Sequence, residues 1–135
     1  MLKKIFLSLS IIFLMLGCSV KTVDKDAFAY SIEGREFKLI SYGKLKMAVP
    51  KKATLLFDNG QYSGYAGCNG MGGKYELSGN KIKFYSGFST MMACPDMKAE
   101  TKFRKLLLEV DNYIMRDDIL VFRKSKEEIL NFKMQ

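Results

Sequence analysis

The most reactive side chains of this chain are its three cysteines, and the chain contains no histidine. Histidine is the commonest general base and metal ligand, so Ser-His-Asp and Cys-His catalytic sites are impossible here. Cys68 and Cys94 lie in the body of the chain, but no pair of cysteines has the C-x-x-C spacing of thiol oxidoreductases. We therefore predict no catalytic residues and no enzymatic activity.

The remaining cysteine, Cys18, follows a segment typical of a signal peptide. Lys3 and Lys4 precede an apolar run from Ile5 to Leu16. This run has about a dozen residues, whereas a helix that spans a bilayer needs about 20. The sequence therefore predicts a signal peptide over residues 1–17.

The residues around Cys18 resemble a bacterial lipobox, in which a small residue precedes a cysteine at the end of an apolar run. The resemblance implies cleavage before Cys18 and transfer of diacylglycerol to its sulfur, so that fatty acyl chains such as palmitate anchor the protein. We expect a lipid-anchored tether over residues 18–34. Ser19 favours the outer membrane of the bacterial cell envelope, facing the periplasm.

The basic charge balance predicts contact with anionic surfaces rather than with nucleic acid, which the envelope location excludes. The formal charge is +8 at pH 7, and Lys3 and Lys4 of the signal peptide supply two of these charges. Four lysines gather in the segment 43–52, which is either a solvated loop or a contact to anionic lipid headgroups. The expected partners are the membrane, through acylated Cys18, and envelope proteins or anionic lipid headgroups. The four lysines are Lys44, Lys46, Lys51 and Lys52.

Cys68 and Cys94 remain for other chemistry once Cys18 carries lipid. In an oxidising compartment they can form a structural disulfide, remain as two buried thiols, or act as a redox pair in a periplasmic thiol enzyme. Our hypothesis is a structural disulfide, because the spacing does not suit redox catalysis. It would close a loop of about 26 residues and contribute roughly 3.5 kcal/mol in the chain-entropy model.

Two further clusters suggest binding sites but have simpler interpretations. Met91, Met92 and Met97 are soft ligands for Cu(I), yet methionine is a frequent gap filler in cores, and no metal or cofactor is expected. Five glycines fit neither the G-x-G-x-x-G pattern nor the P-loop, so turns and bulges are the better interpretation. Asn69 among them is expected to adopt a left-handed or turn conformation and to bond nearby backbone. The glycines are Gly64, Gly67, Gly70, Gly72 and Gly73.

Short strands separated by turn residues dominate the sequence after Gly34. Asn59-Gly60 between two alternating segments is the strongest hairpin signal. About eight strands and one late helix predict an α+β fold, with a small antiparallel, barrel-like sheet and the helix packed before the last strands. The expected strands are 36–42, 53–58, 61–66, 73–77, 81–85, 112–116, 119–123 and 129–134.

The helix is expected from Pro95 to Asp111, where apolar residues recur with three-four spacing. Pro95 suits a first helical turn. Glu100 and Arg104 stand one turn apart and can pair. Four tyrosines on the expected strands are interpreted as cross-strand pairs rather than as a ligand platform. These are Tyr62, Tyr65, Tyr75 and Tyr85.

Two sequence blocks are distinctive. The first is S-G-Y-A-G-C-N over 63–69 followed by G-K-Y over 73–75, and the second is T-M-M-A-C over 90–94 followed by Glu100 and Phe103. Together they resemble the META domain (HslJ-like, DUF306) family over about residues 35–135. Gly70 and Met71 depart from the Arg and aromatic residue that the family often has there. The matching residues are Gly64, Gly67, Cys68, Asn69, Gly73, Tyr75, Thr90, Met92, Ala93 and Cys94.

The resemblance implies a compact antiparallel sheet with one helix, and an envelope protein linked to stress and heat-shock responses. It implies no reaction. The favoured hypothesis is a non-enzymatic lipoprotein with an interaction or structural role in envelope maintenance or stress tolerance. The alternative is a binding module for an apolar ligand, such as a lipid or acyl chain, because a barrel of about eight strands either fills with side chains or holds one small ligand.

Overall fold

The computed structural model describes residues 32–135 of the chain. The expected signal peptide, Cys18 and residues 18–31 of the expected tether lie outside the described residues. Within residues 32–135, no helix is long and apolar enough to cross a membrane.

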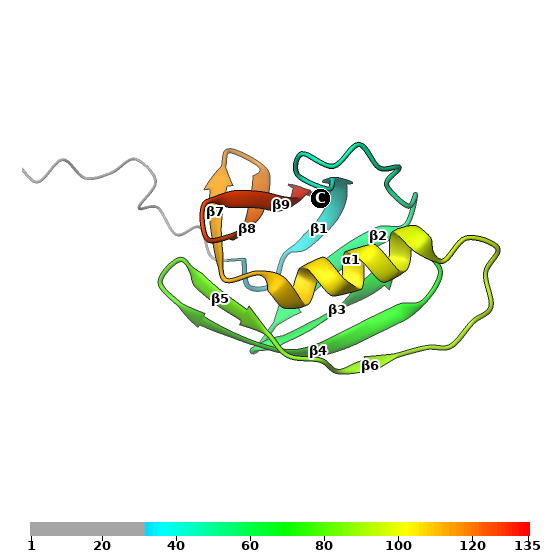
Figure 1. Ribbon diagram of the computed structural model, residues 1–135. Coiled ribbons are helices and arrows are strands. Elements are labelled where there is room, and N and C mark those ends of the chain that lie inside the picture. Colours follow the sequence, from blue (N-terminus) through cyan, green and yellow to red (C-terminus); the bar gives the residue numbers. More distant parts are fainter. Residues whose placement is uncertain (1–31) are drawn as a thin grey trace, which may run out of the picture.

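One antiparallel sheet of nine strands and one helix make up the domain (Figure 1). The strand order is β3-β2-β1-β9-β8-β7-β5-β4-β6, and a further β3–β4 pairing joins the two arms into a ring-like arrangement. The predicted α+β class and barrel-like sheet are therefore confirmed. The elements are β1 Glu36–Ser41, β2 Ala53–Asp58, β3 Gln61–Ala66, β4 Gly70–Ser78, β5 Lys81–Phe84, β6 Phe88–Ser89, α1 Lys98–Glu109, β7 Asn112–Arg116, β8 Ile119–Lys124 and β9 Glu127–Met134.

Turn residues fix the register of the β2–β3 hairpin as the sequence predicts. Asn59 and Gly60 have φ of 47° and 74°, the left-handed region that a two-residue hairpin turn requires. Ala53 then pairs with Ala66 at the other end of the hairpin. The hairpin thus brings the start of β2 and the loop after β3 to the same end of the domain.

Aromatic side chains fill the interior of the ring. Alternate residues of each strand point inward, and the rings of Phe57, Phe84 and Phe122 contact one another with centroids 5.3 to 6.3 Å apart. Phe122 also contacts Phe132, and Phe57 contacts Tyr75. These contacts make a packed core of the interior.

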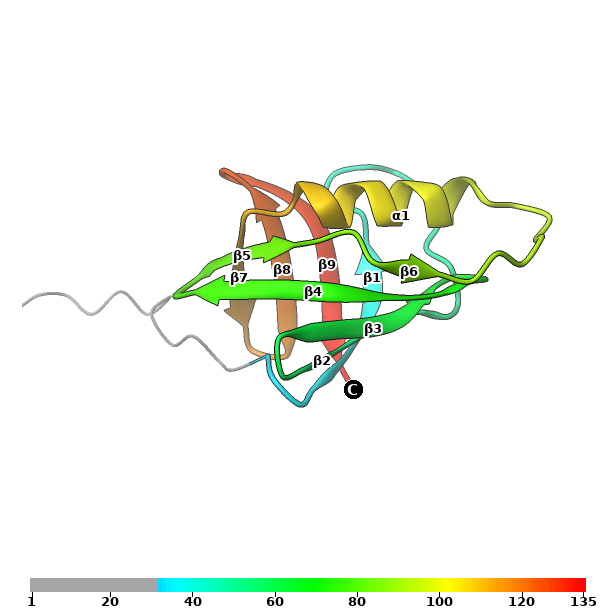
Figure 2. The same cartoon turned by 90° about the horizontal axis from the view of Figure 1, so that it is seen from below.

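Helix α1 covers one opening of the ring and contacts β3, β5 and β9, strands from separate parts of the sheet (Figure 2). Phe103, Leu106 and Leu107 are its buried apolar residues. The predicted start at Pro95 is wrong, because the helix begins at Lys98. Asp96 Oδ1 accepts the Lys98 N–H at 3.0 Å. This local bond from side chain to backbone favours a turn at Asp96 over a helical conformation there.

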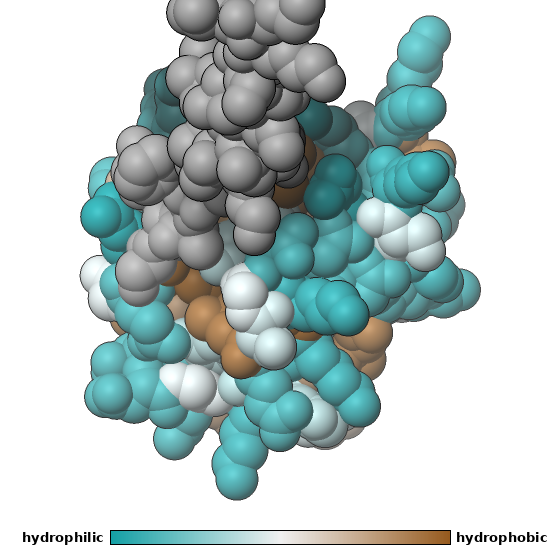
Figure 3. Space-filling model, turned by 90° about the vertical axis from the view of Figure 1, so that its left-hand side faces the viewer, coloured by the Kyte–Doolittle hydropathy of each residue, from teal (hydrophilic) through white to brown (hydrophobic). Residues whose placement is uncertain are grey.

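The side of the domain on which β5 and β7 lie presents mainly hydrophilic residues to solvent (Figure 3). Apolar residues are visible there between the hydrophilic ones (Figure 3), as is common on protein surfaces.

Candidate functional site

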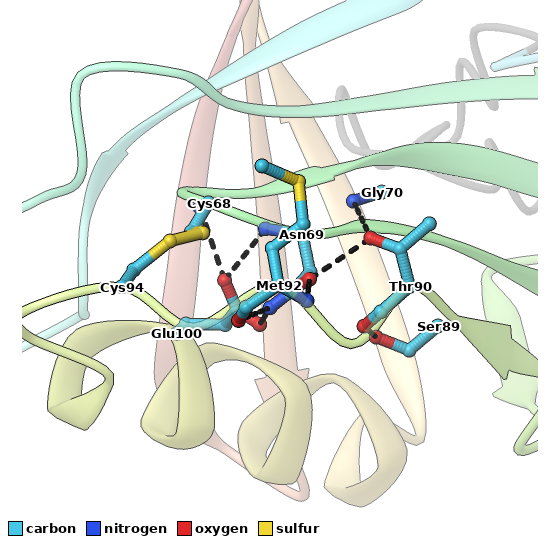
Figure 4. Close-up of a disulfide and its surroundings, with 8 residues drawn as sticks. All are labelled: Cys68, Asn69, Gly70, Ser89, Thr90, Met92, Cys94 and Glu100. Atoms are coloured by element: carbon cyan, nitrogen blue, oxygen red, sulfur yellow. Dashed lines mark hydrogen bonds between the residues drawn. A yellow bond between two sulfur atoms is a disulfide. The ribbon is translucent and has the colours of Figure 1, made fainter.

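Both motif blocks meet at the end of the domain where β2 and β4 begin. Residues 67–69 connect β3 to β4, and residues 90–97 connect β6 to α1. Cys68 and Cys94 form a disulfide between these two loops, with Cα atoms 6.4 Å apart (Figure 4). The predicted disulfide is therefore present in the structure.

Asn69 ties the two loops together beneath the disulfide. Its side chain is buried, and its Oδ1 accepts the Thr90 hydroxyl at 2.9 Å and the Met92 N–H at 2.7 Å. Its Nδ2 donates to Glu100 Oε1 at 2.8 Å. The expected bonds to backbone are confirmed, but the expected left-handed conformation is not found, because Asn69 is absent from the positive-φ residues of the described chain. Gly67, with φ of 131°, turns the chain instead.

Glu100 of α1 receives the other half of this network. Its side chain is 2% exposed, and its Oε2 accepts the backbone N–H groups of Cys68 at 3.0 Å and Asn69 at 2.9 Å. Burial by itself raises the pKa of Glu100. The hydrogen bonds from Asn69 and Cys68, with the Arg104 charge, outweigh burial and hold that pKa below its ordinary value. Arg104, one turn away, thus acts on Glu100 through its charge, while the direct hydrogen-bond partners of Glu100 lie in loop 67–69.

We call the Cys68–Cys94 disulfide, Asn69, Thr90 and Glu100 the clamp. Each hydrogen-bonding group of the Asn69 side chain and both oxygens of Glu100 have partners within it. A buried carboxylate with a lowered pKa stays ionised at neutral pH and is poorly suited to donate a proton. The clamp therefore holds loop 67–69, the segment that contains Thr90, and α1 together.

The clamp holds a strongly exposed apolar segment. Met91 and Met92 are 98% and 61% exposed, although the Met92 N–H is fixed by Asn69. Phe88, just before them on β6, is 66% exposed, and Tyr65 on β3 is 55% exposed. We call these four residues the apolar patch.

Glycines on β4 form the floor under the two aromatic residues of the patch. A Cβ at Gly72 would lie 2.6 Å from the Phe88 ring, and one at Gly70 would lie 3.9 Å from both Tyr65 and Thr90. Gly72 pairs with Phe88 and Gly70 with Tyr65 across neighbouring strands. The absence of a side chain at Gly72 lets the Phe88 ring lie against the backbone of β4, whereas a Cβ at Gly70 would make only ordinary contact with Tyr65.

The other motif residues belong to the sheet rather than to the clamp. A Cβ at Gly64 would lie 2.0 Å from the Thr54 carbonyl oxygen, and one at Gly73 would lie 2.8 Å from the Tyr62 hydroxyl. Tyr75 is buried and its hydroxyl donates to Glu33. These residues permit close strand and ring packing, while Ala93 lies exposed in loop 90–97.

Sequence reasoning named Met92 and Glu100 with the second motif block, but it did not predict that Glu100 ties the two loops together or that the four residues of the apolar patch are exposed. A signal for Glu100 existed, because it lies three and seven residues before the buried Phe103 and Leu107 and so shares their helical face. Tyr65 lies opposite Thr54 and Gly70 of the neighbouring strands, as the cross-strand interpretation expects, and its side chain is exposed. Among residues 32–135, no three Cys, Asp or Glu side chains gather as metal ligands would.

The protein is thus a small α+β domain with a ring-like antiparallel sheet, one helix over an opening of the ring, and a disulfide that joins two loops. The chain belongs to the META domain family, whose model matches residues 30–135. A search of curated proteins finds no match.

Solved structures share the fold at low sequence identity. An NMR structure of a protein from Burkholderia xenovorans has a TM-score of 0.63 and 21% identity, covering 77% of this chain and 83% of that chain. A crystal structure of a DUF4847 family protein from Bacteroides vulgatus has a TM-score of 0.55 and 14% identity, covering 74% of this chain and 92% of that chain. These similarities concern the fold alone.

Proposed function

We propose that this chain is a non-enzymatic, lipid-anchored protein of the bacterial envelope whose META domain binds another envelope protein through the apolar patch. The role is interaction or structural support in envelope maintenance or stress tolerance. The observation that carries the proposal is the exposure of Met91 and Met92 on a loop that the clamp holds in one conformation.

A fixed loop with exposed apolar side chains suits protein recognition. Exposed apolar residues that gather on a surface mark interaction sites, and interfaces are enriched in Tyr, Phe and Met. A loop ordered before binding loses less conformational entropy when a partner docks. Methionine adds flexible contacts that adapt to the partner surface.

The alternative of an apolar ligand inside the sheet gains less support from the structure. Phe57, Phe84 and Phe122 contact one another at the centre of the ring. An interior that is filled by aromatic side chains stabilises the domain by packing. The surface patch is therefore the better candidate for binding.

A photo-crosslinking amino acid placed at Met91 tests the interaction in intact cells. We expect one discrete crosslinked product with an envelope protein, because the side chain at this position points into solvent. The variant Phe88→Glu should reduce its yield at least ten-fold, since it places a charge in the patch. The matched control Leu77→Glu, at an exposed apolar residue of β4, should leave the yield unchanged. Equal yields in both variants would refute the apolar patch as the binding surface.

The lipid anchor is tested separately through Cys18. Cells fed labelled palmitate should incorporate it into the wild-type chain, and Cys18→Ser should abolish incorporation because no sulfur remains to accept diacylglycerol. The variant should also leave the membrane fraction or remain uncleaved. Label that persists in Cys18→Ser would contradict the proposed anchor.

A further inference from the structure

The outer side of α1 carries a row of lysines that no acidic residue of the helix balances. Lys98, Lys102 and Lys105 recur at intervals of four and three residues and so lie on one helical face. The two acidic residues of α1 are engaged elsewhere. Glu100 is buried in the clamp, and Glu109 pairs with Lys124 at 3.3 Å.

Loop 43–52 lies at the same end of the domain as the start of α1 (Figure 1). It contains Lys44, Lys46, Lys51 and Lys52 and no acidic residue. All four lysines are exposed. In the part of the chain that the structure describes, no carboxylate lies within 4.0 Å of any lysine in this loop or in the α1 row. We call these seven lysines the basic face.

An open groove separates the loop from the helix. It has a volume of about 570 Å³ and is lined by all three α1 lysines. Met47 from the loop, with Pro95 and Met97 from the segment before α1, supplies the apolar part of the lining. The only carboxylate of the lining is Asp96. Lysine side chains beside apolar lining residues suit a phospholipid, whose phosphate group lies next to apolar acyl chains.

Charges are distributed unevenly along the domain. The last residue of β2 and the β7–β8 turn, at the end opposite loop 43–52, carry Asp58, Asp117 and Asp118. The start of β9, near loop 43–52, carries Glu127 and Glu128. The seven lysines of the basic face outnumber the carboxylates at their end of the domain, and a domain with such an excess orients in the field of an anionic surface with its basic end inward. The charge pattern therefore favours binding to a negatively charged surface, with the basic face turned toward that surface.

We propose that the basic face docks the domain on the anionic lipid bilayer of the envelope. The lysines contact headgroup phosphates, while Leu45, Met47 and Met97 lie at the boundary with the acyl chains. The surface is distinct from the apolar patch, so docking leaves Met91 to a protein partner. The domain then lies against the membrane instead of moving freely at the end of its tether.

Lysine footprinting of the full chain on vesicles tests this inference. The chain is reconstituted into phosphatidylcholine vesicles with or without phosphatidylglycerol, where either acylated Cys18 or the apolar segment 5–16 retains it. An amine-reactive reagent then labels exposed lysines, and mass spectrometry reports each site. We expect labelling of Lys98, Lys102 and Lys105 to fall at least five-fold in the anionic vesicles alone. Lys81 and Lys83 on β5 should label equally in both.

High salt should restore labelling of the basic face, because screening weakens contacts with headgroups. Equal labelling in neutral and anionic vesicles would overturn the inference. Protection that appears in native envelope membranes but not in vesicles of purified anionic lipid would instead indicate a protein partner and would also overturn it.

Charge-reversal variants separate the basic face from net charge. The triple variant K98E, K102E and K105E should abolish protection of Lys51 and Lys52, since each lysine near an anionic surface contributes roughly five-fold to binding and three together on the order of 100-fold. The matched control K74E, K81E and K83E changes net charge equally on β4 and β5 and should retain protection. Circular dichroism should show both variants folded. Equal loss of protection in the two would mean that net charge alone acts, against the proposal.

Discussion

Replacing Glu100 by alanine is expected to lower the free energy of unfolding by about 3–5 kcal/mol. The change leaves three donors without their acceptor: the N–H groups of Cys68 and Asn69, and Asn69 Nδ2. A buried donor that loses its partner costs roughly 1–3 kcal/mol, and water reaches the half-exposed Cys68 more easily than it reaches Asn69. Guanidinium denaturation measures the loss. The exposed Glu127→Ala should change stability by less than about 0.5 kcal/mol.

Glu100→Gln tests whether the charge of the carboxylate matters as well as its shape. Its amide nitrogen would face a donor, so we expect a loss of about 1–3 kcal/mol at pH 7. The pKa of Glu100 is lowered in the folded chain from 4.5. The wild-type carboxylate therefore contributes stability above about pH 4.5 that is lost as pH falls through the folded pKa. The difference between wild type and Glu100→Gln should narrow in acid. A difference that stays constant from about pH 7 to pH 3 would contradict the assigned hydrogen bonds.

Strands with alternating residues and clear turns were predictable because both signals are local. Asn59-Gly60 marks a hairpin through the backbone conformation that glycine and asparagine adopt easily. The start of β4 was not predictable in this way. Gly70 and Gly72 are poor strand residues by propensity, yet they are tolerated here because rings from β3 and β6 lie over them.

The ninth strand and the start of the helix depend on contacts between distant segments. β6 has only two residues, and Phe88 gains its strand conformation by pairing with Gly72 of β4. Pro95 was a reasonable helix start, but it follows Cys94, which the disulfide ties to loop 67–69. The helix begins three residues later, after Asp96 has bonded the Lys98 N–H.

The clamp was only half predictable because its halves lie on different elements. The motif indicated Cys68, Asn69 and Cys94, and sequence reasoning favoured the disulfide. The spacing of Glu100 and Arg104 indicates only that the two opposite charges on the helix can pair. Only the packing of α1 against the loops shows that Glu100 faces inward and accepts the backbone N–H groups of loop 67–69.

Removing the disulfide is the second change with a large expected effect. The double variant Cys68→Ser and Cys94→Ser should lower the free energy of unfolding by about 3–4 kcal/mol, because the bond closes a loop with a sequence separation of 26 residues. Reductant should shift the wild-type transition by the same amount and leave the double variant unchanged. A wild-type midpoint that ignores reductant would show that the two thiols are not bonded in solution.

The local consequence of that loss distinguishes a clamp from a general crosslink. Hydrogen exchange should become faster in loop 90–97 of the double variant than in the β8–β9 hairpin, because the bonds from Asn69 and Gly70 hold only Thr90 and Met92 at the start of the loop and Cys94 is released. Crosslinking from Met91 should fall as well, since a mobile loop loses more entropy when a partner binds. If exchange instead rises uniformly across the sheet while crosslinking is retained, the disulfide stabilises the whole domain and the apolar patch does not depend on it.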